Sequence, residues 1–576
     1  MVIIGINAYH ADASAAIFVN GNMLAATEEE RFTRVKHWAG FPAKAILFCL
    51  KEAGLSFNDV DFFAIGRDPR AKMLRKILYL AANPGGSVDA VKDRLANSRK
   101  VASIEEELAL ISGLDAAAFK NKVVNVEHHR SHLASAFFAS PFKEAACLSI
   151  DGSGDFTTTM TGVGRGNNIE VLQSVDFPHS LGIFYTAFTQ LLGFPHYGDE
   201  YKVMGMAPYG KPRYTGKLHD VLKLTGNGLF KLNLDYFRKG TAGIISYDDK
   251  HVPIVASLYS QKMLDVFGPS RKKDEELTQY HKDMAASVQR FTEEVIFHLL
   301  THLHKRTGLD NVCIAGGVAQ NSVANGKITR NTPFKNVYIP SAGHDAGISM
   351  GAALYVQHQM ENMPRSPIFS AYTGSRFSNE EIKNILDEKG IAYRQLDDAA
   401  LYDEVTNCLI NGGVVGWMNG RAEFGPRALG ARSIIADPRR NDAKEILNLK
   451  IKRRESFRPF APSILKEYVA DYFELDEPVP FMEKVYPIKK EMHSKIPAVT
   501  HVDGSGRLQS VDKEISPRYH ALIEAFRIKT GVPILLNTSF NENEPIVNSP
   551  QEALACYLRT NMDMLVMENI VVSRQK

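Results

Sequence analysis

Residues 2–19 read VIIGINAYHADASAAIFV, and residues 147–163 read CLSIDGSGDFTTTMTGV. Both stretches contain an apolar run typical of a buried strand, a short turn with acids and hydroxyls, and a second strand-like run. This repetition indicates an internal duplication of one phosphate-facing hairpin. Short apolar runs also alternate with helical patterns further along, with strand candidates at Phe62–Gly66, Val123–Glu127 and Val312–Ala315. The alternation predicts an α/β domain.

A polar stretch with two prolines divides the chain. Residues 359–376 read QMENMPRSPIFSAYTGSR, a composition that predicts a linker. Ser378 as N-cap, an acidic first turn and a closing Gly390 then predict a helix that opens a second unit. We therefore expect one domain over residues 1–358 and another over residues 377–576, with strands of its own at Gly413–Trp417, Val532–Leu536 and Met564–Met567.

Composition narrows the class of protein. The 576 residues are 44% hydrophobic and 23% charged, which excludes wholesale disorder. The charge balance of 68 basic against 65 acidic residues argues against nucleic acid or a membrane as partner. The five cysteines form no C-x-x-C pair, no apolar run reaches roughly 18 residues, and the N-terminus has no basic leader. We expect a cytoplasmic enzyme.

A histidine pair and two aspartates predict a metal site. In VEHHRSHLASAFFAS, residues 126–140, His128 and His132 share one helix face and can reach one ion. Asp151 ends a buried-looking strand, and Asp345 lies in the glycine-rich SAGHDAG. Each of these features alone is more often structural, as a helix cap, a core histidine or a turn aspartate. Together they favour a borderline metal ion such as iron.

Two further groups of motifs suit a nucleotide and its phosphates. Gly316 and Gly317 follow a strand and precede a helix-like run, so their backbone N–H groups could face a nucleotide. Residues 411–460 hold 11 Lys or Arg against five Asp or Glu. Arginine binds phosphate with two parallel hydrogen bonds. The alternative is a solvated basic helix over residues 442–454, but the neighbouring Gly, Pro and Phe favour the wall of a pocket.

Taken in order, these motifs resemble the nodulation and antibiotic O-carbamoyltransferase family. The resemblance spans nearly the whole chain, with the matching stretches GINAYHADASAA, ATEEERFTRVKHWAGFP, HHRSHLASAFF, DGSGDFTTT, GDEYKVMGMAPYG, GGVAQNSVANGKI, GRAEFGPRALGARS, ESFRPFAPS and NTSFN. It implies an actin-like, duplicated ribonuclease H-like N-terminal domain and a YrdC-like α/β C-terminal domain. It also implies that carbamoyl phosphate and ATP form carbamoyl adenylate, whose carbamoyl group passes to a hydroxyl of a sugar or natural product.

The resemblance also implies roles for residues. Iron(II) or another divalent metal would be held by His128, His132, Asp151 and Asp345, and Mg²⁺ would accompany ATP. Where the family commonly reads AAGDAG, this chain reads SAGHDAG, so His344 is an additional candidate ligand beside Asp345. His10 matches a base near the adenylate, although Ala11 separates it from Asp12 where the family often reads HDAS, and Lys36 lies where acceptor contacts occur. Arg458 is expected to be catalytic. The nucleotide and phosphates would be held by Gly316, Gly317, Asn321, Arg427, Lys452, Arg458, Arg507, Asn537, Ser539 and Asn541.

Other functions remain open from the residues. An actin-like small-molecule kinase would leave the arginine-rich second unit without a role. A heat-shock 70 type of chaperone would not need the histidine pair. A tRNA-modifying threonylcarbamoyl-type transferase is opposed by the near-neutral charge. The sequence leaves the acceptor undefined and the oligomeric state open, with a homodimer as one alternative. Acceptor specificity is expected in residues 67–120 and 213–285.

Overall fold

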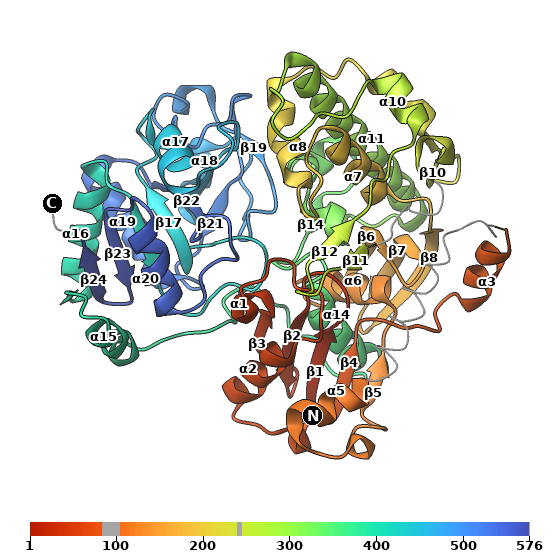
Figure 1. Cartoon of the computed structure of the whole chain (residues 1–576), viewed down its shortest axis with the longest axis horizontal. Coiled ribbons are helices and arrows are strands. Elements are labelled where there is room, and N and C mark those ends of the chain that lie inside the picture. Colours follow the sequence, from red (N-terminus) through yellow and green to blue (C-terminus); the bar gives the residue numbers. More distant parts are fainter. Residues whose placement is uncertain (83–103, 239–244, 575–576) are drawn as a thin grey trace. The chain divides into compact units, whose positions relative to one another are not determined.

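The computed structural model describes residues 1–82, 104–238 and 245–574. They form two compact units (Figure 1). Unit 1 comprises Met1–Ala324 and Ile328–Ile368, and unit 2 comprises Asn325–Lys327 and Phe369–Lys576. The division after Ile368 falls inside the stretch that the sequence predicts as a linker, whose first residues belong to the π-helix Tyr355–Met360.

Unit 1 contains two five-stranded sheets with the same topology. The first has the order β3-β2-β1-β4-β5, with β1 Val2–Asn7, β2 Ser14–Val19, β3 Asn22–Glu28, β4 Phe62–Ile65 and β5 Val123–Asn125. The second has the order β14-β13-β6-β7-β8, with β6 Glu144–Gly154, β7 Thr157–Arg165, β8 Asn168–Asp176, β13 Asn311–Ala315 and β14 Asn336–Tyr338. In each sheet an antiparallel three-stranded meander continues into two parallel strands. The predicted duplication and α/β class are confirmed.

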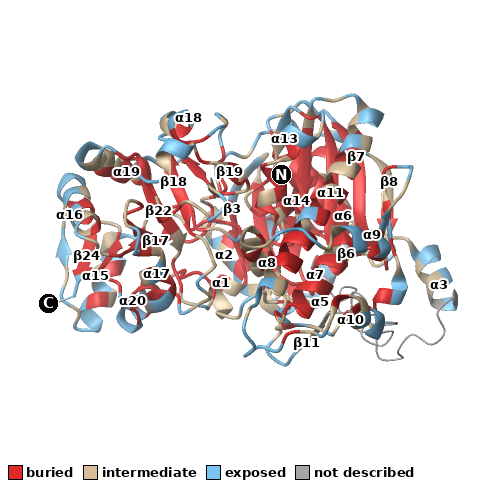
Figure 2. Ribbon diagram, turned by 90° about the horizontal axis from the view of Figure 1, so that it is seen from above, coloured by how far each residue is buried: buried red, intermediate tan, exposed pale blue. Residues whose placement is uncertain are grey.

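Two helices pack closely between these sheets. Helix α6, His128–Phe137, contacts helix α14, Gly347–Leu354, and α14 also packs on β1. A methyl group on Gly351 would lie 1.9 Å from the Ser131 carbonyl oxygen, so the helices approach through backbone. Figure 2 shows α6, α14 and the long helix α11, Gln279–Thr307, as largely buried. The face of α6 that carries the histidine pair therefore belongs to the protein interior.

The run after β13 differs from its prediction. A single helix was expected after Gly316 and Gly317, but the chain forms the 3₁₀-helix Gly317–Gln320, then α12, Ser322–Asn325, and α13, Ile328–Asn331. The interruption between α12 and α13 lies at Gly326 and Lys327. Asn321 precedes α12, and its side-chain oxygen accepts a hydrogen bond from the Ala324 backbone N–H at 3.0 Å. Asparagine side chains compete with helical hydrogen bonds in this way and favour helix starts.

Unit 2 is built on an eight-stranded mixed sheet of order β15-β24-β23-β16-β17-β22-β18-β21. The strands are β15 Arg394–Gln395, β16 Val415–Met418, β17 Arg432–Ala436, β18 Ala461–Leu465, β21 Gln509–Val511, β22 Ile534–Ser539, β23 Met564–Met567 and β24 Ile570–Ser573. Its main helices are α15 Asn379–Glu388, α16 Asp398–Ile410, α19 Pro517–Thr530 and α20 Pro550–Arg559. Ser378 is the N-cap of α15, as the sequence predicts, and it forms a capping box with Glu381.

The predicted basic helix over residues 442–454 is shorter and irregular. Helix α17 covers Ala443–Ile446 and runs into the π-helix Leu447–Ile451. Lys452, immediately after it, is buried. The interpretation as a solvated basic helix is therefore wrong for Lys452, whose side chain follows the π-helical turn and lies in the interior of unit 2.

Two other observations concern the chain as a whole. The five cysteines are free, and all but Cys408 are buried. Burial raises the pKa of the Cys147 thiol well above its usual value. Among the described residues, no helix has both the length and the apolar character needed to cross a bilayer.

Candidate metal centre and arginine cluster

Four side chains of unit 1 converge on one point. His128 and His132 lie on α6, Asp151 on β6, and Asp345 just before α14, and their ligand atoms all lie within 4.8 Å of one another. The Nε2 atom of His128 is 3.1 Å from Asp151 Oδ2, and that of His132 is 3.3 Å from Asp345 Oδ1. All four residues are buried. Two imidazoles and two carboxylates form a donor set suited to a borderline divalent metal.

Unsatisfied polar atoms at this point support a metal. Both ring nitrogens of His132 and the Oδ1 atom of Asp345 are buried without a hydrogen-bond partner. Such groups are rare in proteins and costly. His129, on the same helix, is different because its nitrogens lie 2.7 Å from Ser149 Oγ and 3.0 Å from the Thr157 carbonyl oxygen. The residues therefore fit a metal ion bound by His128, His132, Asp151 and Asp345, whereas His129 has a structural place.

Opposite charges balance inside this cluster. Burial raises the pKa of Asp151, but the hydrogen bond with His128 and the nearby imidazole of His132 outweigh it and hold the pKa well below its usual value. Burial lowers the pKa of His132, but its interactions with Asp151 and Asp345 raise it to about 9. The carboxylates are thus kept ionised by positive charge, which a divalent cation can supply.

Glycines make room for the ligands. A methyl group on Gly154 would lie 2.1 Å from the His128 ring. Gly316, at φ +102°, has no space for a side chain, because a methyl group there would lie 2.1 Å from the Ile150 carbonyl oxygen. The Gly317 backbone N–H donates to Asp151 Oδ1 at 3.0 Å. The glycine-rich turns therefore shape and orient the cluster.

Replacing Gly154 by alanine should displace the His128 ring and lower metal content by about 10-fold or more, because a misplaced ligand weakens metal binding. Gly152→Ala is the matched control, since a methyl group there meets no atom within 4 Å. The metal content per protein molecule is measured on both purified variants. Equal metal content in both would contradict the placement of His128.

The other residues predicted for unit 1 lie as follows. His10 Nδ1 is 2.7 Å from Asp345 Oδ2, so His10 borders the metal cluster. His344 lies outside the four-residue cluster, with its Nε2 4.0 Å from Asp12 Oδ2. Lys36 is exposed in the turn after α1, Glu30–Thr33. The Asn321 amide is engaged with the Gln289 amide at 2.9 and 3.0 Å. Nucleotide binding by Gly316, Gly317 and Asn321 stays a prediction.

Sequence reasoning missed His37. Its Nδ1 atom lies 2.8 Å from Asp12 Oδ1, and with Glu30 these residues form a second group of potential ligand atoms. The only sequence signal for His37 was its place at the end of the charged run at residues 28–37. A single histidine does not stand out among so many acidic and basic residues.

Unit 2 gathers four arginines. Burial and the positive charges of Arg427, Arg454 and Arg458 hold the pKa of Arg507 well below its usual value. Arg458 lies 3.4 Å from Glu455, and Arg454 lies over the Phe460 ring at 4.7 Å. Among the described residues, Arg507 has no ion-pair partner, and its Nε is buried without a hydrogen bond. Like charges in this arrangement call for an anion, and arginine suits phosphate.

Lys452 and its neighbours form an internal network. Lys452 Nζ donates to the backbone oxygens of Ser539 and Asn541 at 2.6 and 2.8 Å and to Asn541 Oδ1 at 2.7 Å. An ammonium group has three donors, so these bonds use its capacity. Asn537 Nδ2 donates to Ser463 Oγ at 3.0 Å. These contacts hold the turn after β22, and phosphate binding by these residues stays a prediction.

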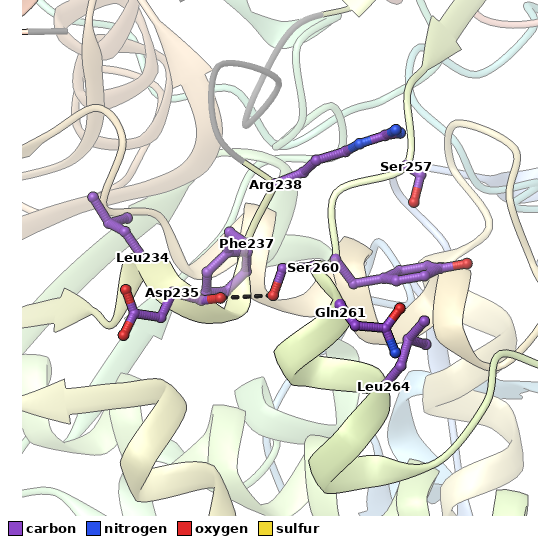
Figure 3. A pocket seen from close by; sticks show the side chains of 9 residues that line it. Leu234, Asp235, Phe237, Arg238, Ser257, Ser260, Gln261 and Leu264 are labelled. Atoms are coloured by element: carbon purple, nitrogen blue, oxygen red, sulfur yellow. Dashed lines mark hydrogen bonds between the residues drawn. The ribbon is translucent and has the colours of Figure 1, made fainter. Parts of the chain in front are cut away.

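A separate cavity of about 510 Å³ lies in unit 1, within the segment where acceptor specificity was expected. Its wall mixes apolar Leu234, Phe237 and Leu264 with several polar side chains. Figure 3 shows Ser260, whose hydroxyl donates to the Asp235 carbonyl oxygen at 2.6 Å, beside Gln261. None of the four candidate metal ligands lines it.

Family models and curated relatives match this chain over most of its length. The family models "Carbamoyltransferase N-terminus" and "Carbamoyltransferase C-terminus" match residues 2–354 and 406–574. Nodulation protein NolNO of Sinorhizobium fredii is 36% identical over 99% of this chain and 80% of its own length. NolO of Bradyrhizobium diazoefficiens is 38% identical over 78% of this chain and 79% of its own. An uncharacterised Synechocystis protein is 42% identical over 99% and 96%, respectively.

Solved structures give weaker likenesses. HypF of T. kodakarensis is 14% identical, with a TM-score of 0.30 over 63% of this chain and 48% of its own. A ROK hexokinase of Thermus thermophilus is 14% identical, with a TM-score of 0.29 over 62% of this chain and 98% of its own.

Proposed function

Because the chain belongs to the carbamoyltransferase family, and is an enzyme of that class, we propose that it is an ATP-dependent O-carbamoyltransferase with two reaction steps. In the first, which we assign to unit 2, carbamoyl phosphate, water and ATP give carbamoyl adenylate, phosphate and pyrophosphate. In the second, assigned to unit 1, an acceptor hydroxyl attacks the carbamoyl carbon and AMP leaves. We propose a sugar or natural product as acceptor and Mg²⁺ as the companion of ATP.

The observation that carries the first step is the arginine cluster around Arg507. Forming a mixed anhydride from ATP and carbamoyl phosphate brings several phosphates into one pocket, and developing negative charge must be stabilised there. Arg427, Arg454 and Arg458 surround Arg507, which has no acidic partner among the described residues. The positive charge of Arg507 is therefore available to bind these phosphates.

The metal cluster supports the second step. Held by His128, His132, Asp151 and Asp345, a divalent ion, which we propose to be iron(II), would polarise the carbamoyl carbonyl. His10, whose Nδ1 lies 2.7 Å from Asp345 Oδ2, would then lie beside the reacting group and hydrogen-bond to it. The acceptor hydroxyl still has to lose its proton, so a base must lie near the metal cluster.

Incubation with ATP and carbamoyl phosphate, without acceptor, tests the proposal. We expect pyrophosphate release that depends on carbamoyl phosphate. An actin-like kinase would instead form ADP. ATP turnover that is indifferent to carbamoyl phosphate would contradict the proposed first step. A panel of hydroxylated acceptors followed by mass spectrometry would then identify the acceptor class.

A further inference from the structure

His37 and Asp12 form a hydrogen-bonded pair beside the metal cluster. Asp12 lies in the turn between β1 and β2, and His37 in the turn after α1. His37 Nδ1 is 2.8 Å from Asp12 Oδ1, and the His37 backbone N–H donates to Glu30 Oε2 at 2.7 Å. The imidazole is thus held both by its ring and by its backbone. A carboxylate on one ring nitrogen fixes the tautomer, so that the other nitrogen can accept a proton.

The second ring nitrogen of His37 is open. It has no hydrogen-bond partner among the described residues, and it is not among the buried unsatisfied atoms. The side chain is 27% exposed, against 16% for His10. A methyl group on Gly198, which has φ +82°, would lie 2.6 Å from His37 Nε2. Gly198 therefore packs closely on this side of the ring, and only a residue without a side chain accommodates His37 in its present position.

Asp12 joins His37 to the surroundings of the metal cluster. On its other side Asp12 Oδ2 is 4.0 Å from His344 Nε2, and His344 precedes the ligand Asp345. The charge of His10 also acts on Asp12. The Tyr197 ring packs edge-on against His37, with 5.1 Å between the ring centroids. Burial raises the pKa of Tyr197, and the charges of Asp345 and Asp151 raise it further. His37 therefore lies next to the group of residues where transfer is proposed.

His10 is less suited to take a proton from an acceptor. Its Nδ1 faces the carboxylate of Asp345, which is needed as a metal ligand. Asp12 is outside the four-residue metal cluster, so its carboxylate can serve the imidazole of His37 throughout the reaction.

We infer that His37, oriented by Asp12, is the general base of carbamoyl transfer, an inference that rests on the proposed function. His37 Nε2 accepts the proton of the acceptor hydroxyl as its oxygen forms a bond to the carbamoyl carbon. The bond from that carbon to the adenylate oxygen breaks, and AMP leaves with the electron pair. The proton then passes from His37 to solvent. His10 remains beside the carbamoyl group.

Chemical rescue tests the inference on the full chain. ATP and carbamoyl phosphate are supplied with ethanol or with the more acidic trifluoroethanol as the hydroxyl donor. Mass spectrometry measures the alkyl carbamate, and pyrophosphate and bound metal are measured on the same samples. The variants are His37→Ala and Asp12→Asn. His196→Ala is the matched control, because His196 is an exposed histidine two residues before Gly198. Each is assayed with and without imidazole.

A general base contributes roughly 10²–10⁴-fold, so His37→Ala should lower ethyl carbamate formation by about 100-fold or more. The loss should be smaller with trifluoroethanol, because its hydroxyl needs less help to ionise, and imidazole should restore part of the rate. Pyrophosphate release, metal content and the His196→Ala control should be unchanged. Ethyl carbamate within about threefold of wild type would overturn the inference. Equal losses for both alcohols without imidazole rescue would overturn it as well, by assigning His37 a structural role.

The pH profile is a second readout. Burial and Lys36 lower the pKa of His37, but Asp12 and Glu30 outweigh them and raise it above its usual value. Tyr197 and Glu200 are the other titratable groups that face the ring. The base must be neutral, so transfer falls as the pH drops through this pKa. Asp12→Asn should therefore move the acidic limb of transfer to lower pH and leave that of pyrophosphate release in place. An unmoved limb would count against His37. Absence of carbamoyl phosphate-dependent pyrophosphate in wild type would instead count against the proposed function.

Discussion

A protein with His132 replaced by alanine should lose carbamoyl transfer by about 100-fold or more while it still releases pyrophosphate. Outer partners of metal ligands already cost roughly 10–100-fold when removed, and His132 is proposed as a ligand itself. Its ring is fully buried, and its Nε2 atom faces the carboxylates of Asp151 and Asp345, the other proposed ligands, at 3.5 and 3.3 Å. Metal analysis, acceptor carbamoylation and pyrophosphate release, measured on one preparation, check the result.

His129→Ala is the control for this change. His129 is equally buried on α6, but Ser149 and Thr157 satisfy it. Its loss leaves these groups unpaired and should lower the free energy of unfolding by about 1–3 kcal/mol, with metal per folded molecule retained. Full metal occupancy in His132→Ala, or equal metal loss in both variants, would contradict the assignment.

The second large effect is expected at Arg507. Its replacement by alanine should lower kcat/KM for pyrophosphate release by about 30-fold or more, because truncating a buried charged contact costs about 2–5 kcal/mol. Arg507→Lys should rescue poorly, since an ammonium group cannot form two parallel hydrogen bonds with phosphate. Arg458→Ala should also lose this activity, although Glu455 lies 3.4 Å from Arg458 and is affected at the same time.

Stability should respond to Arg507→Ala in the opposite direction. Three neighbouring arginines repel Arg507, and no acid compensates it among the described residues. The thermal unfolding temperature without ligands should therefore stay the same or rise. A large fall in Tm together with unchanged pyrophosphate kinetics would mean that Arg507 has a structural role instead of binding phosphates.

The sequence predicted the parts of unit 1 that depend on local pattern. His128 and His132 share a face because a helix repeats every 3.6 residues, and Asp151 and Asp345 follow from glycine-rich turns that end or precede regular elements. The duplicated hairpins were readable for the same reason. That these four side chains meet depends on the close approach of α6 and α14 at Gly351, a packing detail that the pattern alone does not contain.

Long-range contacts could not be predicted. Phosphate binding by Lys452 stays a prediction, but its contacts with the backbone of Ser539 and Asn541, more than eighty positions away, could not be predicted from local pattern. The His37 and Asp12 pair joins two turns that no spacing rule connects. Arg507 could be recognised only as one arginine among several, because its lack of an acidic partner among the described residues is a property of the folded unit.

The central claim is that activation and transfer are separate steps with carbamoyl adenylate between them. The most direct measurement is mass spectrometry of the nucleotides formed by His132→Ala from ATP and carbamoyl phosphate, with pyrophosphate measured in parallel. We expect carbamoyl adenylate or its breakdown product AMP, together with pyrophosphate, and almost no carbamoylated acceptor. Formation of ADP without pyrophosphate, or undiminished acceptor carbamoylation, would contradict the two-step account.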